Sequence, residues 1–468
     1  MRAITLGAYA FLGAALVFTR IFGINRSYWL DEIMTVEDFV RAGPREILAG
    51  HYIPNNHQLF SFLAWVASST IGESEWALRL LSALPFIAGV ALVTAWLHAR
   101  VDAASGILFL FLATVSPLLL DITRQARGYG LAFAAMSVMV VCALELRDRK
   151  DTRLIVGLCA AGVLGTCTLP NVGVAFVAIV TVLLTRPQLR IRALVGSTAA
   201  IVLVAAWYAP HIDDLLEGSR QTYGVEMRLA WLITASIDQI LIPALIWIDG
   251  VVLFPGARWL PLVAAAVLLL SASPLLRDRY TALVLACGPV ATVLVLWITG
   301  TYAVPRFLSY LLVPVFILMA SGIGSVLARL RSGRPQVVRT IVALVTLGLV
   351  AANFVATGTD VVRLPREDHK RVVEAITSSE YASAPVYAHQ LRPRATAFYL
   401  GRPVTAAKAP GWLPVACAAS ERVVVVVQPW VIPPADIPCK ERPGVRRYRF
   451  EQYTRGKEIV VWLVPPAS

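Results

Sequence analysis

The sequence predicts an α-helical polytopic membrane protein, with about eleven spans and a small α/β domain at its C-terminal end. Hydrophobic residues make up 57% of the 468 residues and charged residues only 15%, whereas soluble chains carry about a quarter charged residues. Uncharged apolar runs of roughly the length that crosses a bilayer also recur, at residues 80–97, 103–120, 193–210, 259–276, 307–328 and 340–359. Backbone polar groups in hydrocarbon must bond within their own segment, so we expect these runs to be helices.

The N-terminal run, residues 3–19, lacks a small-residue cleavage site and is expected to be a retained first span. Four basic turns then set the orientation, because cytoplasmic turns carry an excess of Lys and Arg; they are residues 147–153, 186–192, 277–279 and 329–339. The net charge of +13 arises largely in such turns and does not indicate nucleic acid. The uncharged stretch 154–185 is too long for one span, and Pro170-Asn171 interrupts it, which predicts a helical hairpin.

Two further apolar segments are expected to lie at the outer membrane face instead of crossing. Residues 57–72 would form a helix of only about 24 Å, and residues 229–254 contain Asp238 and Asp249. Counting either segment as a span would move the later basic turns to the opposite side. The resulting topology places the amino terminus inside and the carboxyl terminus outside.

Two domains are expected: a transmembrane module at residues 1–357, with a polar outer segment at 22–76, and an outer α/β domain at residues 358–468. The second region contains a polar helical stretch, three β-rich runs and Pro/Gly-rich turns; the stretches are Glu367–Ser378, Pro385–Tyr387, Arg422–Gln428 and Glu458–Val464. Cys417 and Cys439 lie in this region, and an oxidising compartment predicts a disulfide between them. The other four cysteines lie in predicted spans and are expected to be small core residues.

The first outer segment contains an acidic pair, Asp31-Glu32, directly after Tyr28-Trp29. Aromatic rings beside carboxylates at a membrane surface suit a site for an amphipathic ligand. The same residues also fit an interfacial aromatic belt with solvated acids. The segment alone leaves both interpretations open.

Arginines gather at two other outer positions. Arg124, Arg127 and Tyr129 follow the span that ends near Asp121, and Arg306 begins a later span. The guanidinium group suits a phosphate or diphosphate headgroup. Arginines at span ends also extend simply into water. The predicted topology puts the acidic pair and both arginine positions on one face of the membrane.

Several short blocks, taken in order, resemble those of the GT-C glycosyltransferases. They are Trp29-Leu-Asp-Glu32, His57-Gln-Leu-Phe60, Glu75-Trp-Ala-Leu-Arg79, Arg124-Gln-Ala-Arg-Gly-Tyr129 and Pro305-Arg-Phe-Leu308. The resemblance covers roughly the first 150 residues, returns at the last block, and extends to the outer α/β domain. Within that superfamily, the blocks are similar to those of the protein O-mannosyltransferases and lipid A aminoarabinose transferases, a glycosyltransferase family 39-like group.

The resemblance implies a sugar donor linked to polyprenyl phosphate and a general base in the first outer segment, matched here by Asp31. A carboxylate there would take the proton of the acceptor hydroxyl while an anionic phosphate leaves. Arg306, Arg127 and Arg124 are the candidate phosphate ligands, and Glu32 would orient Asp31 or hold the acceptor. His57, Tyr28, Trp29 and Tyr129 are the remaining expected substrate contacts. The acceptor is expected to be a glycolipid, glycan or protein, on the periplasmic face of a bacterial inner membrane.

Two departures from the family pattern bear on the chemistry. This chain has Gln58 and Leu59 where the family usually has two prolines after the histidine, and it lacks the acid usual between Arg124 and Arg127. Asp121 is the nearest substitute for that acid. One carboxylate and a distant histidine are too few ligands for a divalent ion, so we expect no metal and no cofactor.

Walker, dinucleotide-binding and zinc-spacing motifs are absent from the sequence. A transporter or flippase of lipid-linked sugars and a non-catalytic envelope assembly protein are the alternative functions. Transporters usually show paired halves and charged or broken helices near the membrane midplane, and neither is visible in this sequence.

Overall fold

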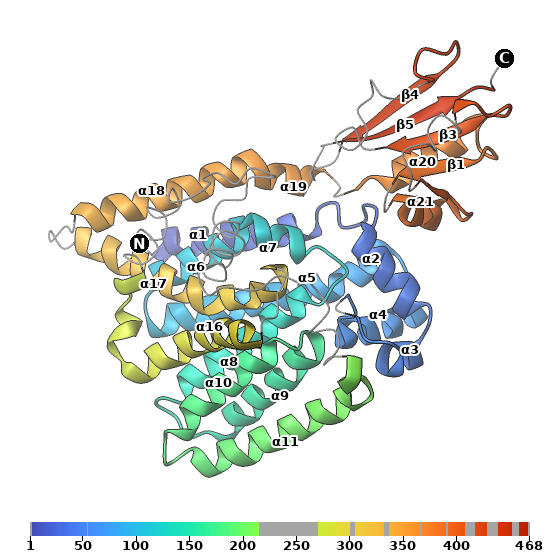
Figure 1. The fold of residues 1–468 in the computed structure, drawn as a ribbon. Helices are drawn as coiled ribbons and strands as arrows, with labels where there is room; N and C mark the ends of the chain where they lie inside the picture. Colours follow the sequence, from blue (N-terminus) through green and yellow to red (C-terminus); the bar gives the residue numbers. More distant parts are fainter. Residues whose placement is uncertain are drawn as a thin grey trace. The chain divides into compact units, whose positions relative to one another are not determined.

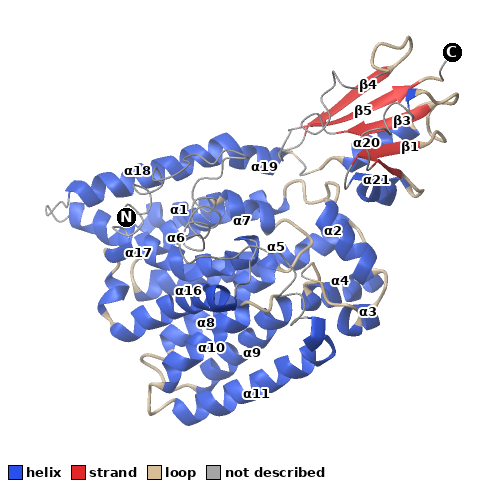
Figure 2. Ribbon diagram, viewed as in Figure 1, coloured by secondary structure: helices blue, strands red, loops and turns tan. Residues whose placement is uncertain are grey.

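The computed structural model describes residues 2–53, 55–214, 270–299, 305–331, 337–364, 367–389, 392–407, 417–427, 439–451 and 458–466. Within these residues the chain is mainly helical, and all strands belong to one sheet near the C-terminal end (Figures 1 and 2). The chain forms two compact units: residues 1–22 with 38–359, and residues 23–37 with 360–468. Residues 23–37 therefore belong with the C-terminal domain, which differs from the expectation that all of segment 22–76 belongs to the transmembrane module.

The helical unit consists of long apolar helices joined by short turns. Its main described helices are α1 (Arg2–Ile21), α3 (Pro44–Ala49), α4 (Gln58–Thr70), α5 (Glu75–Arg100), α6 (Ala103–Val115), α7 (Pro117–Ile122), α8 (Tyr129–Glu145), α9 (Thr152–Thr168), α10 (Val172–Leu184), α11 (Arg190–Tyr208), α16 (Arg279–Thr299), α17 (Leu312–Arg331) and α18 (Val337–Asn353). Among the described residues five helices are long and apolar enough to cross a membrane, and five more are apolar but shorter. The chain is a multi-pass membrane protein.

The predicted helical hairpin is confirmed. Helix α9 ends at Thr168, α10 begins at Val172, and the Pro170-Asn171 turn separates them. Figure 1 shows α8, α9 and α10 alongside one another, with α11 next to α9. The short segment 57–72 contains α4, which is not among these ten apolar helices of the described residues, and its position at the membrane face stays a prediction. Residues 229–254 and most of 259–276 lie outside the described residues.

Two predicted spans differ from single continuous helices. The run 103–120 is divided into α6 and α7 at Ser116, because Pro117 has no N–H with which to continue the first helix. The run 307–328 begins inside a 3-10 helix, η6 (Pro305–Leu311), before α17 continues it. Both irregular stretches lie beside the candidate site described below.

Helices α5 and α8 approach closely enough to exclude a side chain at their crossing. A Cβ atom at Gly130 would lie 1.9 Å from the carbonyl oxygen of Ser82, so only glycine fits there. The N–H of Gly130 also donates to the Ser82 hydroxyl at 3.1 Å. This contact fixes the beginning of α8, whose first residue is Tyr129.

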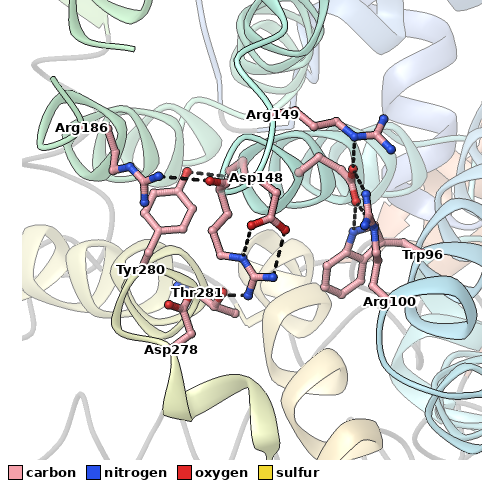
Figure 3. Close-up of polar contacts among 11 residues, drawn as sticks. Trp96, Arg100, Asp148, Arg149, Arg186, Asp278, Tyr280 and Thr281 are labelled. Carbon is pink, nitrogen blue, oxygen red and sulfur yellow. Dashed lines mark hydrogen bonds and ion pairs between the residues drawn. The ribbon is translucent and has the colours of Figure 1, made fainter. Parts of the chain in front are cut away.

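Three of the four basic turns meet at one end of the helical unit. Figure 3 shows this network: Arg186 donates to the carbonyl of Arg147 at 3.0 Å, and Arg147 lies 3.8 Å from the Asp278 carboxylate. The guanidinium of Arg186 also lies over the Tyr280 ring, 5.0 Å from its centre. The prediction that these turns share one side of the bundle is therefore confirmed for 147–153, 186–192 and 277–279. Part of the fourth turn, residues 332–336, is outside the described residues.

A second ion pair at this end joins α5 to α8. Glu145 accepts hydrogen bonds from Trp96 at 2.9 Å and from Arg100 at 2.7 and 2.5 Å (Figure 3). Arg149, in the turn after α8, lies 3.3 Å from the same carboxylate. The carboxylate is largely buried, so these contacts compensate the loss of its hydration.

The C-terminal unit contains a five-stranded mixed sheet with the order β2-β1-β3-β5-β4. Its strands are β1 (Val386–His389), β2 (Thr405–Ala407), β3 (Val423–Val427), β4 (Arg446–Glu451) and β5 (Glu458–Val464). Pairs β1–β2 and β1–β3 are parallel, and pairs β3–β5 and β4–β5 are antiparallel. Helices α20 (His369–Thr377) and α21 (Arg392–Leu400) contact the sheet (Figure 2).

The predicted α/β character of this region is confirmed, although the sequence pattern missed three elements. The polar helix and the three β-rich runs correspond to α20, β1, β3 and β5. Strands β2 and β4 and helix α21 were not predicted. Strand β4 reads Arg-Arg-Tyr-Arg-Phe-Glu, and its charges hide the alternation that marks a strand. The predicted disulfide between Cys417 and Cys439 is present.

Candidate functional site

His57, the residue before α4, lies at the centre of a buried polar cluster in the helical unit. Its Nε2 atom is 2.9 Å from Nη2 of Arg127, and its Nδ1 atom is 2.9 Å from the main-chain nitrogen of Gly128. Nη1 of Arg127 donates to the side-chain carbonyl of Asn55 at 2.6 Å. His57 and Arg127 are almost completely buried, at 1% and 0% exposure. The cluster thus joins the turn before α4 to the turn before α8.

The pKa of His57 lies well below its ordinary value. Burial is the largest cause, and the positive charges of Arg127 and Arg306 add to it. The two ring nitrogens face N–H groups of Arg127 and Gly128, and the neutral imidazole can accept from one of them, whereas a protonated ring could accept from neither. His57 is therefore neutral near pH 7 and contributes hydrogen bonds, while the arginines contribute the charge.

Two aromatic rings enclose His57. The ring of Tyr129 meets it edge to face at 4.9 Å between ring centres, and the ring of Phe307 meets it at 5.9 Å. Tyr129 begins α8, and Phe307 follows Arg306 in η6. Residues from three separate blocks of the sequence are thus brought together. Of the cations near His57, Arg306 is partly exposed, whereas Arg127 is fully enclosed.

Arg124 is also partly exposed and donates to the carbonyl of Phe22 at 2.6 Å. The same turn is held by hydrogen bonds from Arg20, a residue of α1 that the sequence analysis did not single out. Nε of Arg20 donates to the Thr123 hydroxyl at 3.2 Å, and Nη2 donates to the carbonyl of Ala113 at 2.7 Å. Arg20 is completely buried. The signal that would have found it is Pro117, which leaves the Ala113 carbonyl without its helical donor.

The two departures from the family pattern have structural consequences. Gln58 is buried and bridges two helices, because its amide donates to the Ile47 carbonyl at 3.1 Å and its oxygen accepts from Trp207 at 3.0 Å. Gln125 donates to the Asp121 carboxylate at 3.0 Å, and Asp121 is 3% exposed. Among the described residues no three His, Cys, Asp or Glu side chains are grouped closely enough to hold a metal ion.

The acidic pair lies in the other unit, in helix α2 (Leu30–Thr35). Glu32 is fully buried, and its carboxylate accepts the main-chain N–H of Trp29 at 3.1 Å. A Glu at the third helical position that bonds back to the N-cap residue stabilises the start of a helix. Asp31, one residue earlier, is partly exposed. Tyr28 is 1% exposed and its ring packs against Phe398.

The structure therefore brings His57, Arg127, Tyr129 and Arg306 together in the helical unit. It holds Tyr28, Trp29, Asp31 and Glu32 in the C-terminal unit. Asn55 and Arg20 are polar contributors that the sequence analysis missed.

Neither a protein-family model nor a curated protein sequence matches this chain. Solved structures do match. ArnT from Cupriavidus metallidurans in the apo state is 14% identical, with 98% of each chain covered and a TM-score of 0.55. The same protein bound to undecaprenyl phosphate is 13% identical, with 99% of this chain and 100% of that chain covered and a TM-score of 0.53.

The Archaeoglobus fulgidus oligosaccharyltransferase in the apo form is also similar. It is 12% identical, with 90% of this chain and 69% of that chain covered and a TM-score of 0.51. ArnT and this oligosaccharyltransferase are both members of the GT-C superfamily. The likeness extends over nearly the whole chain and includes both units. This protein has the GT-C fold.

Proposed function

We propose that this protein is a glycosyltransferase that moves a sugar from a polyprenyl-phosphate-linked donor to an acceptor hydroxyl on the outer face of the membrane. The observation that carries the proposal is that Arg127 lies 2.9 Å from His57 while Phe307, the residue after Arg306, packs on the same ring, although about 180 residues separate the two arginines in the sequence. Fold alone does not fix function. The GT-C fold and the undecaprenyl phosphate bound by ArnT support a lipid phosphate as the ligand of these cations.

Arg306 is the proposed direct ligand of the donor phosphate. It is partly exposed, while Arg127 is enclosed and held by Asn55 and His57. The neutral His57 lies against Arg127 and fixes its orientation. The buried positive charge of Arg127 then attracts the phosphate without contacting it. Arg124, partly exposed as well, is the second candidate ligand. Positive charge fixed in advance lowers the free energy of a leaving phosphate as its negative charge develops.

Asp31 is the proposed general base. Its carboxylate takes the proton of the acceptor hydroxyl as that oxygen bonds to the anomeric carbon. The bond between the anomeric carbon and the donor phosphate oxygen breaks, and the phosphate leaves with the electron pair. Glu32 holds the first turn of α2 through the N–H of Trp29, which orients Asp31. The proposed orientation of the protein puts this chemistry in the periplasm of a bacterial inner membrane.

The test is to compare envelope glycolipids and glycoproteins by mass spectrometry in cells that lack the gene and in cells that carry it. A sugar-sized mass difference on one class of molecule is expected. Asp31→Asn retains the shape of the side chain but not its basicity, so complementation with this variant should yield at least about 100-fold less product. Asp38→Asn, a second partly exposed acid near α2, is the matched control and should give native product.

Full product from a well-folded Asp31→Asn variant would exclude the proposed base. It would favour a transporter of lipid-linked sugars or a non-catalytic assembly protein, because neither requires a proton acceptor at this position.

A further inference from the structure

The segment that carries Asp31 is held by the C-terminal domain through residues on both sides of α2. Arg26 donates to the carbonyls of Val362 and Leu364 at 2.7 and 3.0 Å. The hydroxyl of Ser27 donates to the carbonyl of Glu367 at 2.9 Å. Lys370 of α20 also donates to the carbonyl of Asn25 at 3.1 Å. Beyond α2, the carboxylate of Glu37 accepts from Arg394 of α21 at 2.7 Å. Segment 23–37 is thus fastened to α20, α21 and the chain before them.

Two consecutive residues of α21 hold Tyr28 by its ring and by its backbone. The Phe398 ring packs edge to face against the Tyr28 ring, with 6.2 Å between ring centres. The hydroxyl oxygen of Tyr399 accepts the main-chain N–H of Tyr28 at 2.5 Å. Tyr28 is the residue before the N-cap of α2, so this contact fixes where the helix begins. Asp31 lies three residues further along.

Helix α2 has six residues and continues directly into the π-helix η1 (Val36–Val40), which gives eleven helical residues in all. Isolated helices shorter than about 12–15 residues are marginal in water, so the order of α2 must come from its contacts. Glu32 supplies one contact within the helix, at the N–H of Trp29. Tyr399 supplies the neighbouring one, at the N–H of Tyr28. Two successive backbone donors before Asp31 are therefore satisfied, one locally and one by the C-terminal domain.

We propose that the C-terminal domain positions the catalytic base, and that Tyr399 is the positioning residue through which α21 sets the direction of Asp31. This inference rests on the proposed function and deepens it. A general base acts only within hydrogen-bond reach of the proton that it takes. A displacement of about 1 Å can lower the rate about 100-fold. The domain thus takes part in the reaction without touching the substrate.

Tyr399→Phe tests the proposal because it removes one hydroxyl and leaves the ring in place. Tyr448→Phe is the matched control, since Tyr448 lies in β4 of the same domain and packs on the sheet. Hydrogen exchange, measured by mass spectrometry on the full-length protein in detergent, should be about 10-fold faster at residues 28–33 in Tyr399→Phe only. Exchange in β1, β3 and β5 should match the wild type in both variants, which shows that the domain remains folded.

Product in complemented cells, per amount of protein, should fall about 10-fold for Tyr399→Phe and stay native for Tyr448→Phe. Binding of undecaprenyl phosphate by the purified variant should stay within about twofold, because its proposed ligands lie in the helical unit. A general loss of structure would weaken this binding as well. Added to Asp31→Asn, the Tyr399→Phe change should lower product no further, since a residue that acts through Asp31 has no effect once the base is gone.

Two outcomes would overturn the positioning role alone. One is unchanged hydrogen exchange at residues 28–33 in Tyr399→Phe. The other is native product from Tyr399→Phe when Asp31→Asn shows a strong loss. An equal further loss in the double variant would also overturn it, because the effect would then not pass through Asp31. Native product from Asp31→Asn would overturn the proposed function and the positioning role together.

Discussion

Arg20 donates from Nη2 to the carbonyl of Ala113 at 2.7 Å, in the place of a helical donor that the chain does not have. The residue four positions after Ala113 is Pro117, which lacks an N–H. Nη1 of Arg20 donates to the next carbonyl, that of Thr114, at 3.0 Å. The guanidinium therefore satisfies the C-terminal end of α6, where a positive charge also interacts favourably with the helix dipole.

Replacing Arg20 should destabilise the helical unit strongly. Arg20→Met keeps much of the side-chain volume but leaves two buried carbonyls without donors, which should lower the free energy of unfolding by about 2–4 kcal/mol. Thermal unfolding of the purified protein in detergent measures the loss. The control is Arg153→Met, at an exposed position, and its stability should match the wild type. Equal midpoints for the two variants would show that Arg20 does not hold this helix end.

The depressed pKa of His57 predicts a pH dependence of stability. Its folded pKa lies well below the value of about 6.5 of an unfolded histidine. Below about pH 6.5 the unfolded chain therefore binds a proton that the folded protein does not, and stability falls as the pH falls. The contribution of His57 is fully present above that pH. Below that pH the contribution of His57 to the free energy of unfolding decreases by up to about 1.4 kcal/mol per pH unit.

His57→Gln has no titrating ring and should flatten this dependence between about pH 6.5 and 5. Thermal midpoints of both proteins, measured across pH 5 to 8, give the comparison. Parallel curves for wild type and variant would mean that His57 does not titrate differently in the folded state.

Arg306 should matter for binding of the lipid phosphate by its shape as well as its charge. Arg306→Lys keeps the positive charge but loses the bidentate geometry, so the affinity of the purified protein for undecaprenyl phosphate should fall about 10-fold or more. The control is Arg153→Lys on the exposed surface. If Arg306→Ala binds undecaprenyl phosphate as tightly as the wild type, Arg306 is not the ligand, and Arg124 and Arg127 become the variants to test.

The Cys417–Cys439 disulfide should stabilise the C-terminal unit. The two cysteines are 22 residues apart and are buried against the sheet face that includes Val425 and Trp462. Closing a loop of this length should contribute about 3 kcal/mol by restricting the unfolded chain. Reduction, or replacement of both cysteines by Ser, should therefore speed hydrogen exchange in β3 and β5. Alkylation of the unfolded protein before and after reduction tests the bond itself; two free thiols in membranes isolated without reductant would contradict it.

The sequence by itself determined the elements whose signal is local. Long apolar runs predict helices because the bilayer leaves the backbone no other partner, and Pro170 marks the turn between α9 and α10 because proline cannot continue a helix. The Val423–Val427 run predicts a buried strand by composition alone. Blocks with a family pattern also directed attention to His57, Arg127 and Arg306 without showing which of them meet.

Only the tertiary structure decided which residues share a surface. Phe307 and His57 come together because both rings pack on Tyr129 at the start of α8, and no local pattern encodes a contact across about 250 residues. The structure also distinguishes the two acids of the pair. Glu32 is buried and caps the start of α2, whereas Asp31 is partly exposed. The Asp31 segment belongs to a domain whose other residues begin more than 300 positions later, because its backbone donors and its Tyr28 ring find their partners there.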